Sequence, residues 1–434
     1  MCEVPDPEER IKTLPLGSPE ATEVPHDPYA AFRLPEYRSY LLGNLATNVG
    51  ANMQSVAVGW EIYERTGSAM ALAWVGLVQA IPIMLLALPA GQLADRLDRR
   101  RIVLCGLVVM VMSSLGLATV SHLHGPVEWM YAMLFLGAVG RAFFWPASQA
   151  LLPQLVSAEV FGTAVTWRST GYQIASVAGP ALGGFMIGMQ RTTMWVYVVD
   201  ATMALVNCYC IAAITARPAK RKEETASLKT VLAGFRYVLN NKLILAALTL
   251  DLFAVLLGGA TALLPIYARD ILRVGPTGLG WLRAAPAVGA FCMAVTLSHL
   301  PPLRRAGWAL LLAVTAFGVA TIVFGFSSLW WLSLVMLACC GAADNISVVV
   351  RHSLVQLGTP DEMRGRVSAV NSVFISTSNE LGEFESGTVA RFFGPVVSVV
   401  SGGIGTIVVV AVTAWTWPEI RKLGKLRDKS PPKA

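Results

Sequence analysis

Charged residues are scarce in this sequence. Only 14% of its 434 residues are Asp, Glu, Lys or Arg and 55% are hydrophobic, whereas about a quarter of a typical soluble domain is charged. The apolar residues fall in blocks of about twenty, the length that a helix needs to cross a bilayer. Short alternating segments, which would indicate transmembrane strands, are missing. These patterns exclude a soluble fold and predict an all-α integral membrane protein.

Motifs for nucleotide or metal chemistry are also missing. Because the sequence has no Gly-x4-Gly-Lys-Ser/Thr loop, ATP bound to this chain cannot supply energy. The seven cysteines are scattered, nearly all within apolar blocks, and show no metal-ligand or redox spacing. His122 and His124 give only a weak metal signal, and no nucleophile with a base can be assembled. We predict no cofactor, no metal and no enzymatic activity.

Twelve blocks are long enough to span a membrane. They predict two six-helix bundles, residues 38–216 and 243–417, separated by a polar cytoplasmic linker, residues 217–242. Residues 1–37, rich in proline and acids, are expected to form a disordered cytoplasmic tail without a cleavable signal peptide, and residues 418–434 a basic cytoplasmic tail. The expected spans are 38–63, 69–94, 102–121, 127–151, 161–188, 193–216, 243–268, 278–298, 307–326, 329–351, 367–392 and 396–417.

Basic residues predict the orientation. Most lie in alternate loops, in the linker and in the C-terminal tail, and the opposite loops hold only Arg65, Arg191, Arg269, Arg273 and Arg391. The positive-inside rule therefore predicts that both termini are cytoplasmic, in a cell inner membrane. This distribution explains the net charge of +7 by orientation and lipid contact rather than by nucleic-acid binding.

The two halves share short sequence matches. Ile62-Tyr63-Glu64-Arg65 recurs as Ile266-Tyr267-Ala268-Arg269, and Gln154-Leu155 with Glu159 and Gly162 recurs as Gln356-Leu357 with Glu362 and Gly365. The separation of the matches is nearly constant. A duplicated bundle with a central site, as in transporters built from repeats, explains them.

The loop between the second and third expected spans reads Gly91-Gln-Leu-Ala-Asp95-Arg96-Leu-Asp98-Arg99-Arg100-Arg101. With the two-half layout, it resembles the signature loop of the major facilitator superfamily. Pro146-Ala-Ser-Gln-Ala-Leu-Leu-Pro153 and Arg364-Gly-Arg-Val-Ser-Ala-Val-Asn371, which leads to residues 379–386, are similar to the drug- and siderophore-exporting branch. That branch includes enterobactin exporters and macrolide efflux proteins.

The resemblance implies a cytoplasmic gate at this loop, formed against span 11 by Gly91, Asp95, Arg96, Arg99 and Arg100. Asp95 can accept hydrogen bonds from a helix N-terminus or an arginine. The counterpart at residues 300–307 has no aspartate, so we expect the N-terminal copy to dominate. Alternatively, the loop is only a topology signal.

Span 5 contains Gly179, Pro180, Gly183 and Gly184, which resemble the Gly-Pro motif of family exporters. Small residues allow close helix packing, and the proline can bend the span. The full motif has glycine where this chain has Ala175 and Thr166. An export-specific hinge and ordinary packing are both open readings.

Charges inside spans are costly in lipid and therefore suggest function. The candidates for proton coupling are Asp251, Asp344, Glu380 and Glu383. Glu380 and Glu383, three residues apart, share a helix face, and their repulsion favours holding a proton. A polar network that ties span 11 to its neighbours is the alternative.

Arg141 falls opposite Asp344 in the repeat, so these two residues are candidates for an ion pair or for gating charges. Asn44, Asn48 and Asn52 form a polar stripe on span 1. The stripe suits contact with substrate, helped by Arg141 and by the aromatic residues Trp60 and Phe144. Helix association is the alternative role for the asparagines.

These features predict a monomeric secondary transporter whose partners are a small-molecule substrate, protons and membrane lipid. Proton-coupled export of a small amphipathic compound, a siderophore or drug-like molecule, is the interpretation that accounts for most of them. An importer or facilitator with the same fold is one alternative. A non-transporting membrane sensor or scaffold, with the linker as a docking site, is another.

Overall fold

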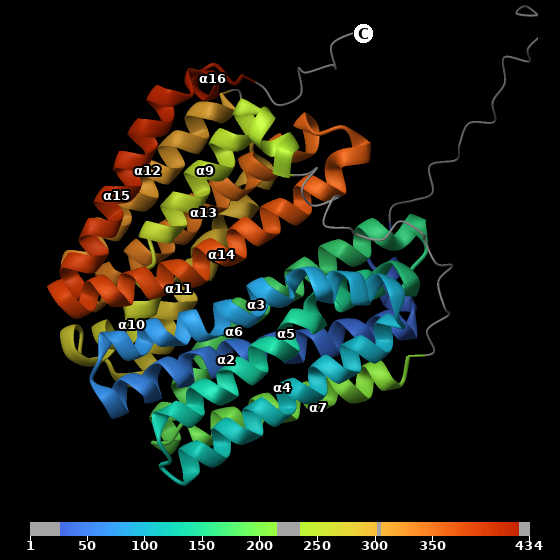
Figure 1. The fold of residues 1–434 in the computed structure, drawn as a ribbon, viewed down its shortest axis with the longest axis vertical. Helices are drawn as coiled ribbons and strands as arrows, with labels where there is room; N and C mark the ends of the chain where they lie inside the picture. Colours follow the sequence, from blue (N-terminus) through green and yellow to red (C-terminus); the bar gives the residue numbers. More distant parts are fainter. Residues whose placement is uncertain (1–26, 215–234, 302–304, 425–434) are drawn as a thin grey trace, which may run out of the picture.

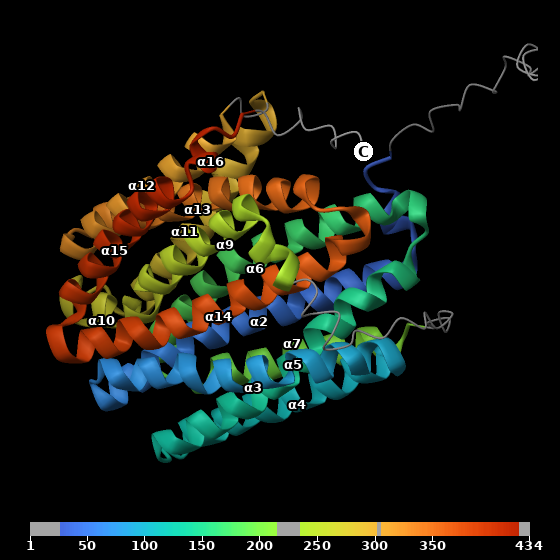
Figure 2. The same cartoon turned by 45° about the horizontal axis from the view of Figure 1, so that its top comes forward.

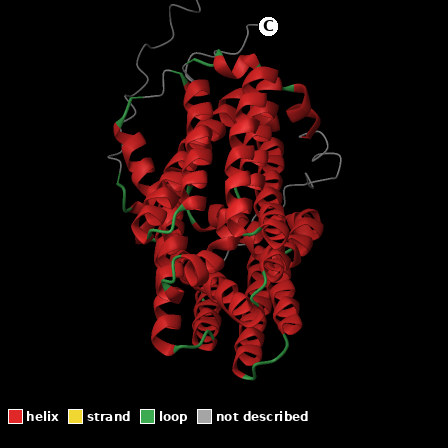
Figure 3. Ribbon diagram, turned by 90° about the vertical axis from the view of Figure 1, so that its left-hand side faces the viewer, coloured by secondary structure: helices red, strands yellow, loops and turns green. Residues whose placement is uncertain are grey.

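The computed structural model describes residues 27–214, 235–301 and 305–424, and these residues form helices without a strand (Figure 3). The prediction of an all-α chain is confirmed for this part. Residues 1–26 of the expected disordered tail, most of the linker and residues 425–434 of the basic tail lie outside the described residues. Residues 27–37 of the first tail contain the short helix η1 (Ala30–Arg33), in which Ala31 is buried, and the start of a long helix at Pro35, so this part is helical rather than disordered. The basic tail begins with the short helix α16 (Pro418–Arg421). The long helices are α2 (Pro35–Thr66), α3 (Ala69–Arg96), α4 (Arg99–His122), α5 (Val127–Leu155), α6 (Ala158–Gln190), α7 (Met194–Ala212), α9 (Lys242–Leu257), α11 (Gly275–His299), α12 (Ala306–Phe326), α13 (Trp330–Gly358), α14 (Asp361–Phe393) and α15 (Pro395–Thr416).

Nine candidate membrane spans are found among the described residues, judged by length and composition. The expected spans 1, 5 and 11 correspond to α2, α6 and α14, which have 32, 33 and 33 residues but are not among the nine candidate spans. Helices α2 and α14 are the most polar of the long helices. Their polarity comes from the asparagine stripe on α2 and from the glutamates of α14. The most polar long helices are therefore among those that carry candidate site residues.

The expected seventh span is interrupted. Helix α9 ends at Leu257, and short helical turns follow: η2 (Ala260–Leu263), α10 (Leu264–Ile266) and the π-helical turn η3 (Tyr267–Ile271). The interruption begins at Gly258 and Gly259. A Cβ on Gly259 would lie 2.6 Å from the carbonyl oxygen of Gly382 in α14. Glycine is required there because the two backbones come this close.

Helices of each sequence half pack mainly with one another, α2–α7 in the N-terminal half and α9–α15 in the C-terminal half (Figure 1). The pairs α6 with α11 and α3 with α14 make most of the contacts between the halves, and α2 adds smaller contacts with α10 and α11. The ribbons of the halves converge at one end and separate at the other (Figures 1 and 2). We call the converging end the Gly67 end, because α2 turns into α3 there at Gly67, with φ 60°. The other is the linker end, where α7 stops and α9 starts.

Close glycine contacts hold the halves together toward the Gly67 end. A Cβ on Gly280 of α11 would lie 2.4 Å from the carbonyl oxygen of Pro180 in α6. A Cβ on Gly387 of α14 would lie 2.6 Å from the Cβ atom of Ala73 in α3. Small residues permit such approaches between helices. The halves are thus in backbone contact at this end.

Candidate functional site

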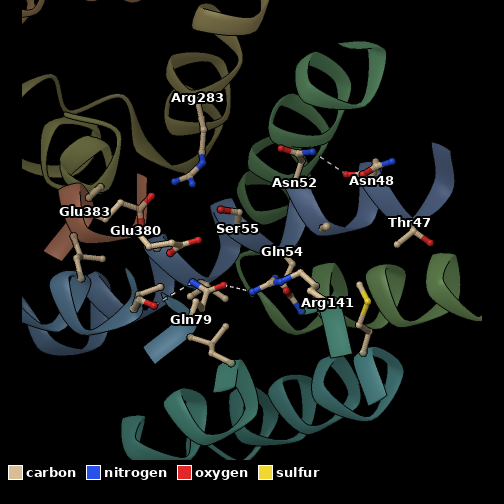
Figure 4. Close-up of a pocket in the computed structure, with 18 of the residues that line it drawn as sticks. Thr47, Asn48, Asn52, Gln54, Ser55, Gln79, Arg141, Arg283, Glu380 and Glu383 are labelled. Carbon is tan, nitrogen blue, oxygen red and sulfur yellow. Dashed lines mark hydrogen bonds between the residues drawn. The ribbon is translucent and has the colours of Figure 1, made fainter. Parts of the chain in front are cut away.

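A cavity of about 340 Å³ lies between the two halves. Its wall combines α2, α3, α5 and α6 from the N-terminal half with α10, α11 and α14 from the C-terminal half. Figure 4 shows polar side chains of both halves pointing into this space. The labelled lining residues are Thr47, Asn48, Asn52, Gln54, Ser55, Gln79, Arg141, Arg283, Glu380 and Glu383.

The asparagine stripe divides between the cavity and a helix contact. Asn48 and Asn52 line the cavity, and each donates its Nδ2 hydrogen to the carbonyl oxygen four residues earlier, at 2.8 Å. Their Oδ1 atoms are thus the groups left to accept hydrogen bonds. Asn44 is buried and accepts a hydrogen bond from Ser148 of α5 at 3.1 Å. The stripe therefore offers acceptors to the cavity and ties α2 to α5.

Arg141 of α5 lines the cavity, where its Nη2 donates to Oε1 of Gln79 in α3. Gln79 is itself oriented by a 3.2 Å hydrogen bond from its Nε2 to the Val75 carbonyl. Phe144 also lines the cavity, as the sequence predicts, together with Trp145 and Tyr172, whose ring centroids are 6.3 Å apart. Trp60 instead belongs to the apolar core at the Gly67 end.

Glu380 and Glu383 both line the cavity, from one face of α14. Arg283 of α11 points toward them (Figure 4). A Cβ on Gly76 of α3 would lie only 2.9 Å from Cβ of Glu383, so the carboxylates sit at a tight contact between the halves. The site thus brings together two acids and two arginines from three helices, α5, α11 and α14.

Asp251 and Asp344 lie elsewhere, in the C-terminal half. Both line a second, much smaller cavity between α9, α12 and α13. Asp251 forms a buried ion pair with Arg351 of α13, the last residue of the expected span 329–351. Arg141 and Asp344 line different cavities and are not brought together. The roles of Asp251 and Asp344 in proton coupling stay predictions.

One buried acid was missed by the sequence analysis. Asp200 of α7 is 5% exposed and accepts a 2.6 Å hydrogen bond from Ser114 of α4, whose Oγ also accepts one from the cavity residue Gln54 at 3.1 Å. Asp200 and Arg141 also interact electrostatically. The signal was present, since Asp200 is a charge within expected span 6 and the rule applied to the other spans would have found it.

The loop predicted to gate lies at the linker end. The side chain of Asp95 lies outside the described residues, and Arg96 ends α3 with an exposed side chain. Arg100 donates to the carbonyl oxygens of Ile211, at 3.1 Å, and Ala212, and Arg99 donates to that of Ala150 at 3.4 Å. The Ile211 and Ala212 carbonyls lie in the last turn of α7, where cations are stabilising, and Ala150 lies five residues before the end of α5 in the same half. A Cβ on Gly91 would meet no atom within 4 Å.

The Gly-Pro segment of α6 contacts two helices. A Cβ on Gly179 would lie 2.5 Å from Cβ of Asn52, and one on Gly183 would lie 3.0 Å from the Met53 backbone, both in α2. A Cβ on Gly184 would lie 2.5 Å from the Pro276 carbonyl of α11. Pro180 lies inside the helix. The segment therefore packs α6 closely on both halves, and its role as a hinge stays a prediction.

Comparisons with known proteins place this geometry in a family. Enterobactin exporters EntS from Shigella boydii and Escherichia coli O157:H7 are each 25% identical over 395 residues, covering 89% of this chain and 93% of theirs. A bacterial homologue of the human lysosomal transporter Spinster has a similar fold, with a TM-score of 0.68, 15% identity and coverage of 94% of this chain and 100% of that one.

The nucleoside transporter NupG is also similar in fold, with a TM-score of 0.69, 11% identity and coverage of 89% and 99%. The family model described as transmembrane secretion effector matches residues 26–427. The chain therefore belongs to this family of the major facilitator superfamily, as the resemblance of its loops predicted, and is a transporter rather than an enzyme.

Proposed function

We propose that this protein is a proton-coupled exporter of a small amphipathic compound, a siderophore or drug-like molecule, in a cell inner membrane. The observation that carries the proposal is the cavity between the halves, which presents Glu380, Glu383, Arg141 and Arg283 beside the asparagine acceptors. Charged groups at this depth are costly unless they face protein or water, and are therefore retained for function. The names of the enterobactin-exporting relatives support a siderophore as the substrate class.

The proposal includes alternating access by twelve spans arranged as two six-helix bundles. The polar helices α2, α6 and α14 cross the membrane with the nine apolar spans, because their polar faces are turned to the cavity. The linker end is cytoplasmic and so are both termini, in accordance with the basic loops. With the halves in contact at the Gly67 end, this arrangement exposes the cavity to the cytoplasm.

Coupling of export to proton entry requires that substrate and protons exclude one another at the site. Glu380 and Glu383 meet this requirement if the substrate donates hydrogen bonds to their carboxylates when the protons have left. The free Oδ1 atoms of Asn48 and Asn52 accept such bonds as well. A substrate rich in hydroxyl or amide donors therefore fits this wall, with acceptors facing Arg141 and aromatic groups against Phe144 and Trp145.

The remaining candidates have secondary roles in this proposal. Asp344 and the buried Asp251–Arg351 ion pair lie at one small cavity inside the C-terminal half. In this proposal, protonation of the two aspartates accompanies movement of α9 against α13. Asp95 latches the linker end when it closes. The protein acts as a monomer surrounded by lipid.

Substrate-driven proton flux in proteoliposomes tests the proposal. With enterobactin as the first probe of a panel, the wild type should move protons against substrate, and the Glu380→Gln, Glu383→Gln double variant should lose most of this flux. Glu385→Gln is the matched control, because Glu385 is on the same helix but does not line the cavity. Unchanged coupling in the double variant would contradict the proposal that Glu380 and Glu383 carry the protons. Substrate flux without proton flux in the wild type would indicate a facilitator.

A further inference from the structure

The duplicated Ile-Tyr-x-Arg motif, residues 62–65 and 266–269, lies at the Gly67 end in both halves. The first copy belongs to the last turns of α2, and the second overlaps the turn η3. Both copies therefore place a tyrosine and an arginine near the point where the halves meet. Their side chains make different contacts.

One tyrosine and one arginine bond within their own half. Tyr267 donates to the Gly325 carbonyl at 2.9 Å and stacks on Phe324 with ring centroids 4.6 Å apart. Arg65 pairs with Glu61 and donates to the Gly125 carbonyl at 2.9 Å. Glu61 is 3% exposed and also accepts hydrogen bonds from Thr193 and Tyr197 of the same half. These contacts anchor the end of α2 within the N-terminal half.

The other tyrosine and arginine reach across to the opposite half. Tyr63 donates its hydroxyl hydrogen to Oδ2 of Asp270. Arg269 donates to the carbonyl oxygens of Tyr63, at 3.2 Å, and Glu64, at 3.3 Å, and its Cζ is 5.7 Å from the Tyr63 ring centroid. The Tyr63 carbonyl also accepts a 2.8 Å hydrogen bond from the N–H of Gly67. Carbonyls in the last turn of a helix, such as that of Glu64, carry partial negative charge that an arginine stabilises. Arg269 therefore acts as a cap for α2 that is supplied by the other half.

The π-helical turn Tyr267–Ile271 carries both Arg269 and Asp270. Turns of π-helix are uncommon and occur frequently at functional sites. The interruption of the seventh expected span is thus located where the two cross-contacts are made.

We propose that Tyr63, Arg269 and Asp270 form a reversible latch between the halves, which holds the Gly67 end shut and opens in each transport cycle. The inference rests on the proposed alternating access. Arg269 and Asp270 are exposed, so water can replace their bonds and the latch is weak enough to open. The pair of buried Glu61 with the partly exposed Arg65 stays closed and keeps the α2 side of the latch fixed. None of the three residues lines the cavity, and they are positioning residues.

Pulsed EPR distances in the purified full-length protein test the latch. Leu123→Cys and Phe392→Cys place exposed labels at the Gly67 end, one on each half, and Leu97→Cys with Leu357→Cys do so at the linker end. The seven native cysteines are replaced first. Tyr63→Phe should raise the ratio of open to closed Gly67 ends about tenfold, the effect of losing one hydrogen bond to a charged group. Arg269→Gln should act in the same direction.

Tyr267→Phe is the matched control. Tyr267 is the repeat counterpart of Tyr63, but its hydroxyl bonds to the Gly325 carbonyl within the C-terminal half. This substitution should leave the distance at the Gly67 end unchanged. Suppose that the wild type opens the Gly67 end at some pH and that Tyr63→Phe and Arg269→Gln open it in no larger fraction of molecules. The proposal of a latch is then wrong, whereas alternating access is retained. If neither the wild type nor any variant ever opens this end, alternating access fails and the latch with it.

Discussion

The two ends of the molecule differ in how their apolar cores are arranged. At the Gly67 end one core contains residues of both halves, with Val56 and Trp60 of α2 packed in the same cluster as Leu263 and Leu279. At the linker end the N-terminal half has a core around Tyr40 and Leu151, and the C-terminal half has separate cores. Separation of the halves at the linker end therefore exposes no shared core, whereas opening the Gly67 end must break one.

The glycines of the two ends show the same difference. Gly184 and Gly280 sit where an added Cβ would overlap the backbone of the other half, whereas Gly91 and Gly162 near the linker end have open space. At the linker end, Gly91 of the gate loop therefore makes no close contact with the described residues of the C-terminal half. A substitution of glycine by alanine is therefore expected to disturb contact between the halves at the Gly67 end and not at Gly91 or Gly162.

The largest effect is expected from Gly280→Ala. Its Cβ would lie 2.4 Å from the Pro180 carbonyl, so the backbones of α6 and α11 must move apart, at a cost of about 1–3 kcal/mol. The Gly67 end should then open in a much larger share of molecules, measured with the spin-label pair at that end. Gly162→Ala, on the same α6 but in open space, is the control. Equal distance distributions in both variants would mean that the close approach does not hold this end shut.

A smaller effect is expected at the linker end from Asp95→Asn. The lost charge weakens a contact that forms when this end closes, and one such contact contributes about 0.5–2 kcal/mol. Turnover should fall several-fold, while Arg305→Gln, in the degenerate second loop, should change it by less than about twofold. Transport rates in proteoliposomes measure both. Similar losses of turnover in the two variants would indicate that the loop of residues 91–101 only sets the orientation of the chain in the membrane.

Much of the fold could be predicted from the sequence, because periodic apolar blocks determine where helices form in a membrane. The expected spans overlap the long helices of the structure throughout the described residues. The interruption at Gly258 and Gly259 could not be predicted, since it depends on the close approach of α14. A glycine pair in an apolar block does not by itself indicate a break.

The candidate site was predictable in part. Polar residues in apolar blocks identified Asn48, Asn52, Arg141, Glu380 and Glu383, all of which line the cavity. Partners could not be predicted, because they come from distant elements: Gln79 for Arg141, Arg351 for Asp251 and Asp270 for Tyr63. Arg351 is the last residue of an expected span and Asp270 lies between two expected spans, so their positions in the sequence do not indicate their partners, which tertiary packing decides.

The central claim is that the cavity opens to one side of the membrane at a time. Reactivity of Ser55→Cys, a cavity position, toward a membrane-impermeant thiol reagent tests this most directly, in a cysteine-free chain in right-side-out and inside-out vesicles. The account predicts reaction from the linker side in the wild type. It also predicts that Gly280→Ala lowers this rate and raises the rate from the Gly67 side. Reaction from one side alone in every variant and at every pH, or rates that rise together on both sides, would contradict it.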